Sequence, residues 1–119
     1  IRYSAQKYTE GKSKPDFIFP SIDDYHDPKF PVARLTMLGA KTTIKERWRQ
    51  VLDEADRIED KHLVTLEPAV SEDYTRAMAK DRLSLVVPSS LFETYTPAQR
   101  EWLMSVNDFC RLVEARQHE

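Results

Sequence analysis

The stretch Leu35–Glu54, LTMLGAKTTIKERWRQVLDE, decides the fold of this chain. An apolar run typical of a strand ends at Gly39 and Ala40 and is followed at once by Lys41. A helical pattern then brings Glu54, thirteen positions after the lysine. We therefore predict a strand–helix unit in which a lysine at the strand end lies close to a carboxylate from the following helix.

The helix of this unit is predicted from its cap and its apolar period. Thr43, with Glu46 three positions later, forms a capping-box pattern. At about 100° per residue, Arg47 and Glu54 share one flank of the apolar face, so Glu54 can turn toward the strand. The alternative is a solvated Glu54 that pairs along the helix with Gln50. The apolar face consists of Ile44, Trp48, Val51, Leu52, Ala55 and Ile58.

Length and composition indicate one folded domain. A chain of 119 residues is long enough for a single core, and its 40% hydrophobic content argues against wholesale disorder. It has no apolar run of the ~20 residues that a membrane span needs, and no signal-peptide pattern. The single cysteine, Cys110, excludes a disulfide framework within one chain and favours a reducing, intracellular compartment. Because the chain opens with Ile1, we expect it to be part of a larger protein.

The charge is unevenly distributed along the chain. The net charge is −2, with a pI near 6.0, which is not typical of a non-specific nucleic-acid coat protein. Between Lys41 and Arg49, however, four basic residues stand against one acid, Glu46. A local basic patch suits a protein that contacts a polyanion at one place. The alternative is an ordinary solvated helix face.

The region before this unit contains a second strand and a loop. The segment Pro15–Pro20, PDFIFP, predicts a short strand between two prolines, with Asp16 at its start. The segment Ser21–Pro31 predicts a loop that holds Tyr25. A strand over Val32–Lys41 follows, and its small residues near the end allow another group to approach the backbone closely.

The region after the unit alternates strands and helices. We predict a strand over His62–Leu66, a helix from Ser71 to about Lys80, and a strand over Leu83–Val87, and such strands usually pair in parallel. Thr96 and Pro97 predict the start of one long final helix. Its inward residues would be Ala98, Trp102, Val106, Phe109, Cys110 and Val113. The fold class is therefore an α/β sandwich, with an antiparallel pair joined to a parallel continuation and helices on both faces.

Asp16, Lys41 and Glu54 form the candidate chemical site. Asp16 begins one strand and Lys41 ends its predicted partner, so both lie at one end of the sheet, where Glu54 arrives from the helix. Two carboxylates can hold Mg²⁺, which prefers oxygen ligands. A nearby lysine can orient or deprotonate water and offset charge on a phosphate. The basic residues that follow Lys41 can hold a phosphodiester backbone or read base edges.

This order of residues resembles the PD-(D/E)XK nucleases, in the branch whose second acid has moved to the following helix. Pro15 and Asp16 match the PD, Lys41 matches the lysine, Gly39 stands where the usual acid would be, and Glu54 matches the relocated acid. Over residues 9 to 113 the chain also resembles the catalytic C-terminal domain of EcoRII-type restriction endonucleases. The blocks that carry this resemblance are KPDFIFPS, YHD, LGAKTT, ERWRQVLDEADRI, KHL, TLEP and LVVPSSL.

The resemblance implies a restriction-endonuclease-like α/β/α sandwich with a mixed sheet, a domain that begins upstream of Ile1. It also implies Mg²⁺-dependent cleavage of double-stranded DNA at a short CCWGG-like site, by a homodimer in the complete protein, in the cytoplasm of a bacterial or archaeal cell. By matching positions, the metal ligands would be Asp16 and Glu54, the other catalytic residues Lys41 and Tyr25, and the DNA-reading residues Lys45, Glu46 and Arg47.

The chain departs from the family pattern at Lys45, where relatives often have arginine, and lysine lacks the bidentate fork of that side chain. Two alternative functions also stay open. One is a catalytically silent DNA-binding or regulatory module of the same fold, against which the complete set of Asp16, Lys41 and Glu54 speaks. The other is a protein-interaction domain, which would be favoured if the patch around Lys45 and Arg47 had no role in DNA binding.

Overall fold

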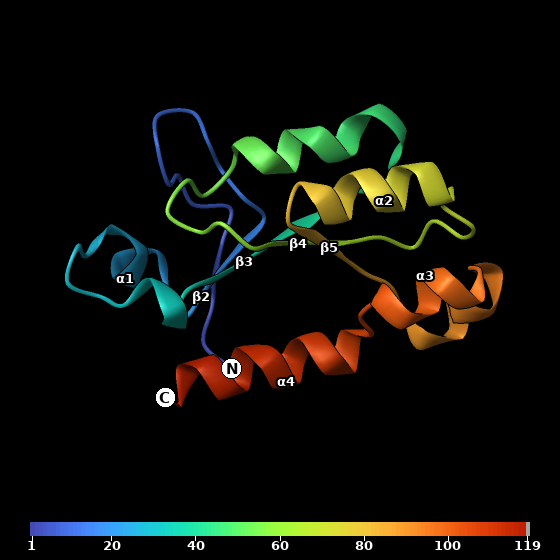
Figure 1. Cartoon of the computed structure of the whole chain (residues 1–119). Coiled ribbons are helices and arrows are strands. Elements are labelled where there is room, and N and C mark those ends of the chain that lie inside the picture. Colours follow the sequence, from blue (N-terminus) through green and yellow to red (C-terminus); the bar gives the residue numbers. More distant parts are fainter. Residues whose placement is uncertain (119) are drawn as a thin grey trace.

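A five-stranded mixed sheet lies in the middle of the molecule (Figure 1). The structure is a computed structural model, and it describes residues 1–118, with every side chain among them except that of Glu46. The strands follow in sequence order across the sheet: β1 (Ser4–Ala5), β2 (Phe17–Phe19), β3 (Thr36–Ala40), β4 (Lys61–Val64) and β5 (Leu83–Val86). β1, β2 and β3 are antiparallel neighbours, while β3, β4 and β5 run parallel. The predicted antiparallel pair with a parallel continuation is confirmed.

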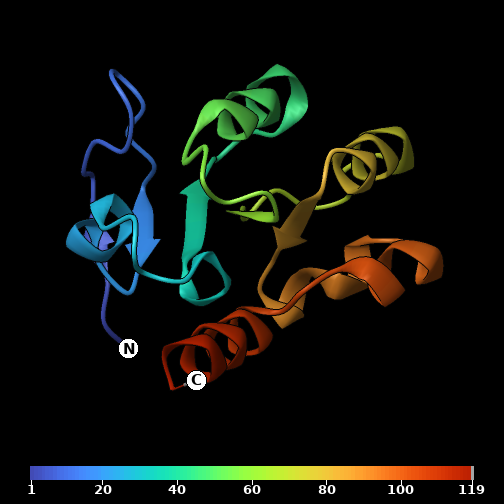
Figure 2. The ribbon, with the colours of Figure 1, turned by 60° about the vertical axis from the view of Figure 1, so that its left-hand side comes forward.

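Helices cover both faces of this sheet (Figure 2). The 3₁₀ helix η2 (Lys45–Asp53) and α2 (Glu72–Lys80) lie on one face, and α4 (Val106–Gln117) lies on the other. On the first face Trp48 and Met78 belong to the main hydrophobic cluster, and on the second Phe109 packs in a smaller cluster with Phe19 and Val86. The predicted α/β/α sandwich is therefore correct. None of the helices in residues 1–118 is long and apolar enough to cross a membrane.

The inward residues predicted for η2 are buried, apart from Leu52, which is half-buried. The predicted bounds are wrong, because η2 ends at Asp53, Glu54 is extended, and Ala55 and Ile58 lie in the turn that follows. The helix is of the 3₁₀ type and begins after Ile44, without a side-chain cap among the residues described. The amide of Ile44 instead donates to Oε2 of Glu67, at 3.2 Å. The amide at the start of η2 is thus satisfied by a carboxylate from the segment after β4, a contact that local sequence spacing does not predict.

Gly39 allows η2 to pack closely on β3. A Cβ atom at this position would lie 3.0 Å from Cγ2 of Val51 and 3.3 Å from its Cγ1. The small residues at the end of β3 were predicted to allow another group to approach the backbone, and that group is the side chain of Val51 on η2. No side chain larger than hydrogen fits here without displacement, so an acid cannot occupy position 39 in this packing.

Two predicted boundaries around β2 and β3 are wrong. The segment Ser21–Pro31 is not all loop, because it contains α1 (Ile22–His26), whose first turn is capped by the Ser21 hydroxyl, 3.1 Å from the Asp24 amide. The strand predicted over Val32–Lys41 begins late. Its first residues form the 3₁₀ turn η1 (Val32–Arg34), and β3 follows. The Ser21 cap starts a helix within the predicted loop, and Pro31 starts a 3₁₀ turn within the predicted strand.

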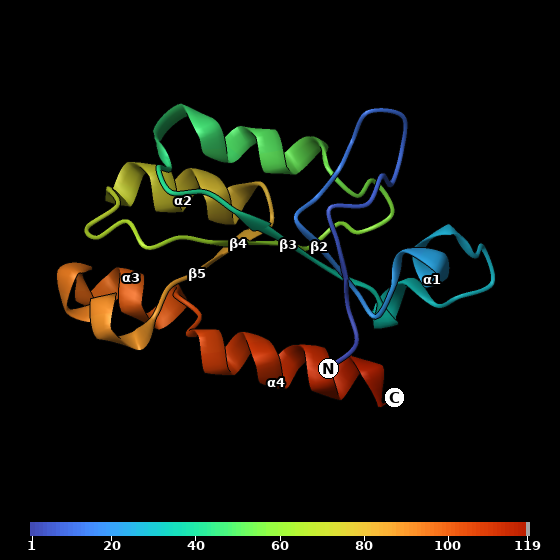
Figure 3. The same ribbon diagram turned by 180° about the vertical axis from the view of Figure 1, so that it is seen from behind.

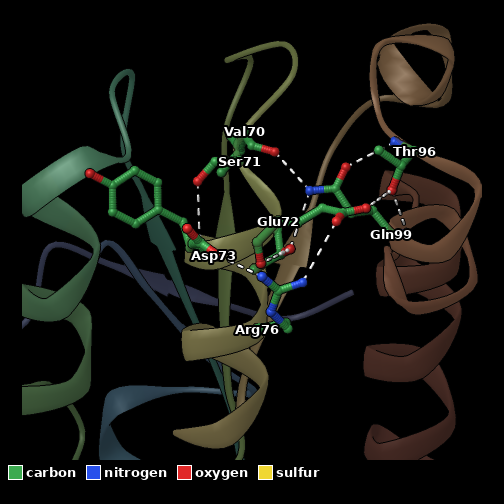
Figure 4. Close-up of polar contacts among 9 residues, drawn as sticks. Val70, Ser71, Glu72, Asp73, Arg76, Thr96 and Gln99 are labelled. Carbon is green, nitrogen blue, oxygen red and sulfur yellow. Dashed lines mark hydrogen bonds and ion pairs between the residues drawn. The ribbon is translucent and has the colours of Figure 1, made fainter.

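The predicted final helix is divided in two. Thr96 and Pro97 begin α3 (Pro97–Trp102), and the capping box of Thr96 and Gln99 is formed (Figure 4). Between α3 and α4, Met104 pairs with the edge of β5: its carbonyl accepts from Val87 at 2.9 Å. The change of direction leaves Val106 and Cys110 exposed rather than inward. A further 3₁₀ helix, η3 (Ser89–Thr94), precedes α3.

Buried Gln99 joins α3 to the start of α2 (Figure 4). Its amide nitrogen donates to the Val70 carbonyl at 2.7 Å and to the Thr75 hydroxyl at 3.2 Å, while its oxygen accepts from the Thr96 amide at 2.9 Å. At the other end of the molecule, the chain start lies beside the end of α4 (Figure 3), where Gln117 exchanges two hydrogen bonds with the backbone of Arg2. Gln99 thus fixes α3 to α2, and Gln117 fixes the end of α4 to the chain start before β1.

Candidate active site

Asp16 is held at the end of the β2–β3 pair. It directly precedes β2, and its Oδ2 accepts from the backbone amide of Ala40, the last residue of β3, at 2.7 Å. Its Oδ1 accepts from Nε2 of Gln6 at 2.9 Å. The carboxylate is half-buried. Two donors thus fix the position of Asp16, and one of them is the residue before Lys41.

Lys41 lies at the strand end, as predicted. Its amide donates to the Val64 carbonyl at 3.1 Å, which continues the pairing of β3 with β4 by one residue. Its ammonium donates to Oε1 of Gln50, on η2, at 3.4 Å. The backbone of Lys41 is therefore part of the sheet, while its half-buried side chain is turned toward the helix.

Glu54 carries the clearest electrostatic signature of the site. It follows the last residue of η2 in an extended conformation, and its Oε1 is buried without a hydrogen-bond partner in the described part of the chain. Burial raises the pKa of the Glu54 carboxyl to about 7, and the negative charge of Asp16 adds to the rise, whereas the positive charge of Lys41 opposes it. The structure thus brings Asp16, Lys41 and Glu54 within electrostatic range, and the solvated alternative for Glu54 is wrong.

Lys61 supports the turn that follows Glu54, a role that sequence reasoning missed. Its buried ammonium donates to the carbonyl of Ala55 at 3.2 Å and to the carbonyl of Ile58. Ala55 has a φ of 53°, a left-handed conformation that costs free energy for a residue other than glycine. The ammonium therefore stabilises a strained turn and adds a positive charge near Glu54. The only sign of this role in the sequence is the position of Lys61 directly before the predicted apolar strand.

Tyr25 is fully buried and lies in a separate polar network. Its hydroxyl donates to Oε2 of Glu10 and accepts from the Arg57 amide at 3.1 Å. The Arg57 guanidinium donates to the carbonyls of Tyr25, Asp27 and Phe30. Burial raises the pKa of the Tyr25 hydroxyl. The Tyr25 network thus reaches Arg57, three residues after Glu54. Its hydrogen bonds involve neither the Asp16 nor the Glu54 carboxylate.

The predicted DNA-reading residues lie at the start of η2. Lys45 and Arg47 are exposed, and the side chain of Glu46 lies outside the described residues. Arg49, from the same basic run, is oriented differently: its guanidinium lies 4.4 Å from the ring centroid of Trp48 and 3.7 Å from Asp81, at the end of α2. The exposed cations nearest in sequence to Lys41 are thus Lys45 and Arg47.

The donor set suits a hard divalent cation. Asp16 and Glu54 offer carboxylate oxygens, and the orphaned Oε1 of Glu54 is a buried acceptor that a cation or a proton would satisfy. Within residues 1–118, no group of three or more His, Cys, Asp or Glu side chains is close enough to hold a metal ion. Any remaining ligands would therefore be water, backbone carbonyls or phosphate oxygens, which are ligands that Mg²⁺ accepts.

The fold defines a class of protein. A mixed sheet between two helical layers is the fold of a restriction-endonuclease-like protein, and Asp16 and Lys41 lie at one end of its antiparallel pair. The family model described as EcoRII C terminal matches residues 1–110, and the chain belongs to that family.

Comparisons with known proteins agree with this assignment. The chain is 50% identical over 107 residues to the type II restriction enzyme EcoRII of Escherichia coli, an alignment that covers 90% of this chain and 26% of that enzyme. Among solved structures it resembles metal-depleted Ecl18kI in complex with uncleaved, modified DNA (TM-score 0.81, 21% identity) and with uncleaved DNA (TM-score 0.79, 23% identity). Each alignment covers 99% of this chain and 40% of the Ecl18kI chain, and it supports the fold.

Proposed function

We propose that this chain is the catalytic domain of a type II restriction endonuclease, which hydrolyses phosphodiester bonds of double-stranded DNA at a short CCWGG-like site and requires Mg²⁺. The observation that carries the proposal is the meeting of Asp16, Lys41 and Glu54 at one end of the sheet, with a buried Glu54 oxygen left without a partner. Membership of the EcoRII C-terminal family supports it. The chain spans about a quarter of the length of the curated relative that it matches.

The roles follow from the chemistry of each group. Asp16 and Glu54 would hold Mg²⁺, which when bound supplies Lewis-acid stabilisation of the charge that develops on the phosphate. The Ala40 amide and Gln6 keep the Asp16 carboxylate in place. Lys41 carries the positive charge that offsets the phosphate and orients the attacking water, and Gln50 holds its ammonium at the helix.

Recognition is proposed for the exposed start of η2. Lys45 and Arg47 would donate to guanine O6 and N7, and Glu46 would accept from the cytosine amino group. The complete protein would bind its duplex as a homodimer, with residues 1–119 as the catalytic domain in the C-terminal portion of a larger chain. A cytoplasmic location is part of the same proposal.

The cleavage test compares wild type with Lys41→Ala and Glu54→Gln on duplexes that contain CCWGG or a scrambled site, with Mg²⁺ or with EDTA. Wild type should cut only the CCWGG duplex and only with Mg²⁺. Each variant should lose about 10²-fold or more in single-turnover rate while it still binds, because each removes a charge that acts on the reacting phosphate. Lys80→Ala, on an exposed lysine at the end of α2, is the matched control.

The same assay separates the alternatives. Binding by wild type without any Mg²⁺-dependent cutting would replace the proposal with a catalytically silent DNA-binding module. Absence of binding would favour a protein-interaction domain. For recognition, Arg47→Ala should relax or abolish the preference for CCWGG, and wild-type rate and preference in that variant would exclude Arg47 as a reader of bases.

A further inference from the structure

The segment of residues 7–14, KYTEGKSK, connects β1 to Asp16 and is here called the basic loop. It contains three lysines, Lys7, Lys12 and Lys14, and all three are exposed. Tyr8 is 58% exposed, and the Lys14 ammonium lies 5.4 Å from the centroid of its ring. A large aromatic side chain and three cations are thus presented to solvent by eight consecutive residues.

The one acid of the basic loop does not neutralise this surface. Glu10 is turned inward, where its carboxylate accepts from the Tyr25 hydroxyl and from the Asp56 amide, the latter at 3.4 Å. The hydrogen bond from Tyr25 is one of the causes that lower the pKa of Glu10, against the effect of its burial. The carboxylate of Glu10 is thus half-buried and hydrogen-bonded on its inner side, and the exposed charged side chains of the basic loop are its three lysines.

The basic loop has a defined backbone. The Thr9 amide donates to the Ser13 carbonyl at 2.9 Å, and the Ser13 amide donates to the Glu10 carbonyl at 2.6 Å. Gly11, with a φ of +47°, supplies the left-handed residue that this tight turn requires. Thr9 is buried. Because the turn is already formed, binding of a ligand by its lysines would cost little backbone entropy.

Hydrogen bonds hold both ends of the basic loop near the acidic residues of the proposed site. Directly before the loop, Gln6 donates to Oδ1 of Asp16. At its end, the Ser13 hydroxyl donates to the carbonyl of Asp53, at 3.3 Å, directly before Glu54. Figures 1 and 3 show the loop from opposite sides, and in both it lies beside the end of η2 and the segment that follows. A phosphate held at the proposed site through a cation on Asp16 and Glu54 would thus have the loop next to it.

We propose that the basic loop binds the sugar–phosphate backbone of the DNA duplex next to the bond that is cleaved. Lysines are point charges suited to phosphates and carry little sequence information, so this contact would give affinity and register, not base preference. The placement of the loop favours DNA over an unrelated polyanion. This inference rests on the proposed function for the identity of the ligand, but binding can be measured without cleavage.

The experiment measures duplex binding without metal as a function of salt concentration, for wild type and the triple variant Lys7→Gln, Lys12→Gln, Lys14→Gln. Each lost phosphate contact should reduce the slope of log K against log [salt] by about 0.9, so the triple variant should lose about 2 to 3 from the slope. The loss of affinity should be equal for CCWGG and scrambled duplexes. A charge-matched control, Lys29→Gln, Lys80→Gln, Arg111→Gln, changes three exposed cations on other elements.

Several outcomes would overturn the inference: a slope for the triple variant equal to that of the charge-matched control, a loss confined to the CCWGG duplex, or wild type that binds neither duplex. Thermal unfolding should be unchanged, because the three side chains are exposed. If the triple variant nevertheless fails to fold, the single variants should each reduce the slope by about 0.9, and no change in any of them would contradict the proposal. Binding with the predicted slopes but without Mg²⁺-dependent cleavage would refute the proposed function alone.

Discussion

At the scale of single residues, Tyr25 connects three segments of the chain. Its hydroxyl donates to Glu10 in the basic loop and accepts from the amide of Arg57, while its own carbonyl accepts from the Arg57 guanidinium. The side chain is 1% exposed. We therefore expect Tyr25 to act as a positioning residue that keeps the segment after Glu54 in place.

Tyr25→Phe tests this role. The change removes the hydroxyl that bonds to the Arg57 amide and to Oε2 of Glu10, so the free energy of unfolding should fall by about 1–3 kcal/mol. Cleavage should need more Mg²⁺ than in wild type and recover at saturating Mg²⁺, with duplex binding unchanged. Urea unfolding and single-turnover rates over a range of Mg²⁺ concentrations measure both effects. A rate that stays low at every Mg²⁺ concentration, with wild-type stability, would mean that Tyr25 acts on the phosphate itself.

The residues that sequence reasoning found and missed differ in one physical respect. Asp16, Lys41 and Glu54 each stand at an element boundary, and the pattern of strands and helices alone predicts that they meet. The Gln6 side chain acts on the Asp16 carboxylate, and the Lys61 ammonium acts on the carbonyls of Ala55 and Ile58. None of these contacts follows from a period or a motif, because each depends on how a loop or a turn packs on the completed sheet.

At the scale of elements, the contact between β3 and η2 is closest at Gly39. A Cβ atom there would lie 3.0 Å from Cγ2 of Val51, so a side chain at position 39 would require Val51 to move. The same contact fixes the distance of η2 from the sheet. In the proposed site, this close packing accounts for a glycine on the strand and an acid, Glu54, from the end of the helix.

A double-mutant cycle tests this contact. Gly39→Ala should destabilise the protein by about 1–3 kcal/mol, because its methyl group would overlap the Val51 side chain. Val51→Ala should cost roughly 1–3 kcal/mol through lost burial and a cavity. The double variant should be more stable than the sum of the two losses predicts, by about 0.5 kcal/mol or more, because the shortened side chain makes room for the new methyl. Free energies of unfolding that simply add would contradict the proposed contact.

Two of the wrongly predicted element boundaries share a cause. The hydrophobic period correctly placed the apolar face of η2 and the parallel strands β4 and β5. The break between α3 and α4 arises because Met104 pairs with the edge of β5, and the start of η2 is capped by Glu67 from a distant segment. Both are tertiary contacts that override local pattern. The short helix α1 was missed because it has only five residues, too few for a period to appear.

At the scale of the whole molecule, two ionisable groups on opposite faces of the sheet, Glu54 and His62, make opposite contributions to the pH dependence of stability. Glu54 belongs to the side of η2, and His62 lies against Phe109 of α4, with ring centroids 5.2 Å apart. Burial, aided by the positive charge of Arg116, lowers the pKa of His62 to about 4 from an ordinary value of 6.5. Burial raises the pKa of Glu54 to about 7 from an ordinary value of 4.5.

The signs of the two effects are opposite over nearly the same pH range. Between about 4.5 and 7, folded Glu54 holds a proton that the unfolded chain has released, so its contribution to stability falls as pH rises. Between about 4 and 6.5, folded His62 is neutral while the unfolded chain binds a proton, so its contribution rises with pH. We expect the two to offset each other in wild type, which should show a nearly constant free energy of unfolding between about pH 4.5 and 6.5.

Removing either group should reveal the other. In Glu54→Gln the free energy of unfolding should rise with pH across this range, by up to about 1 kcal/mol per pH unit, because only His62 then titrates. In His62→Gln it should fall with pH by a similar amount, and in the double variant it should again be nearly constant. Urea unfolding in EDTA at several pH values measures all four proteins. Since the two groups share no partner among the causes of their pKa shifts, the effects should add. If the free energy of unfolding changed with pH in the same direction in both single variants, the opposite contributions assigned to Glu54 and His62 would be wrong.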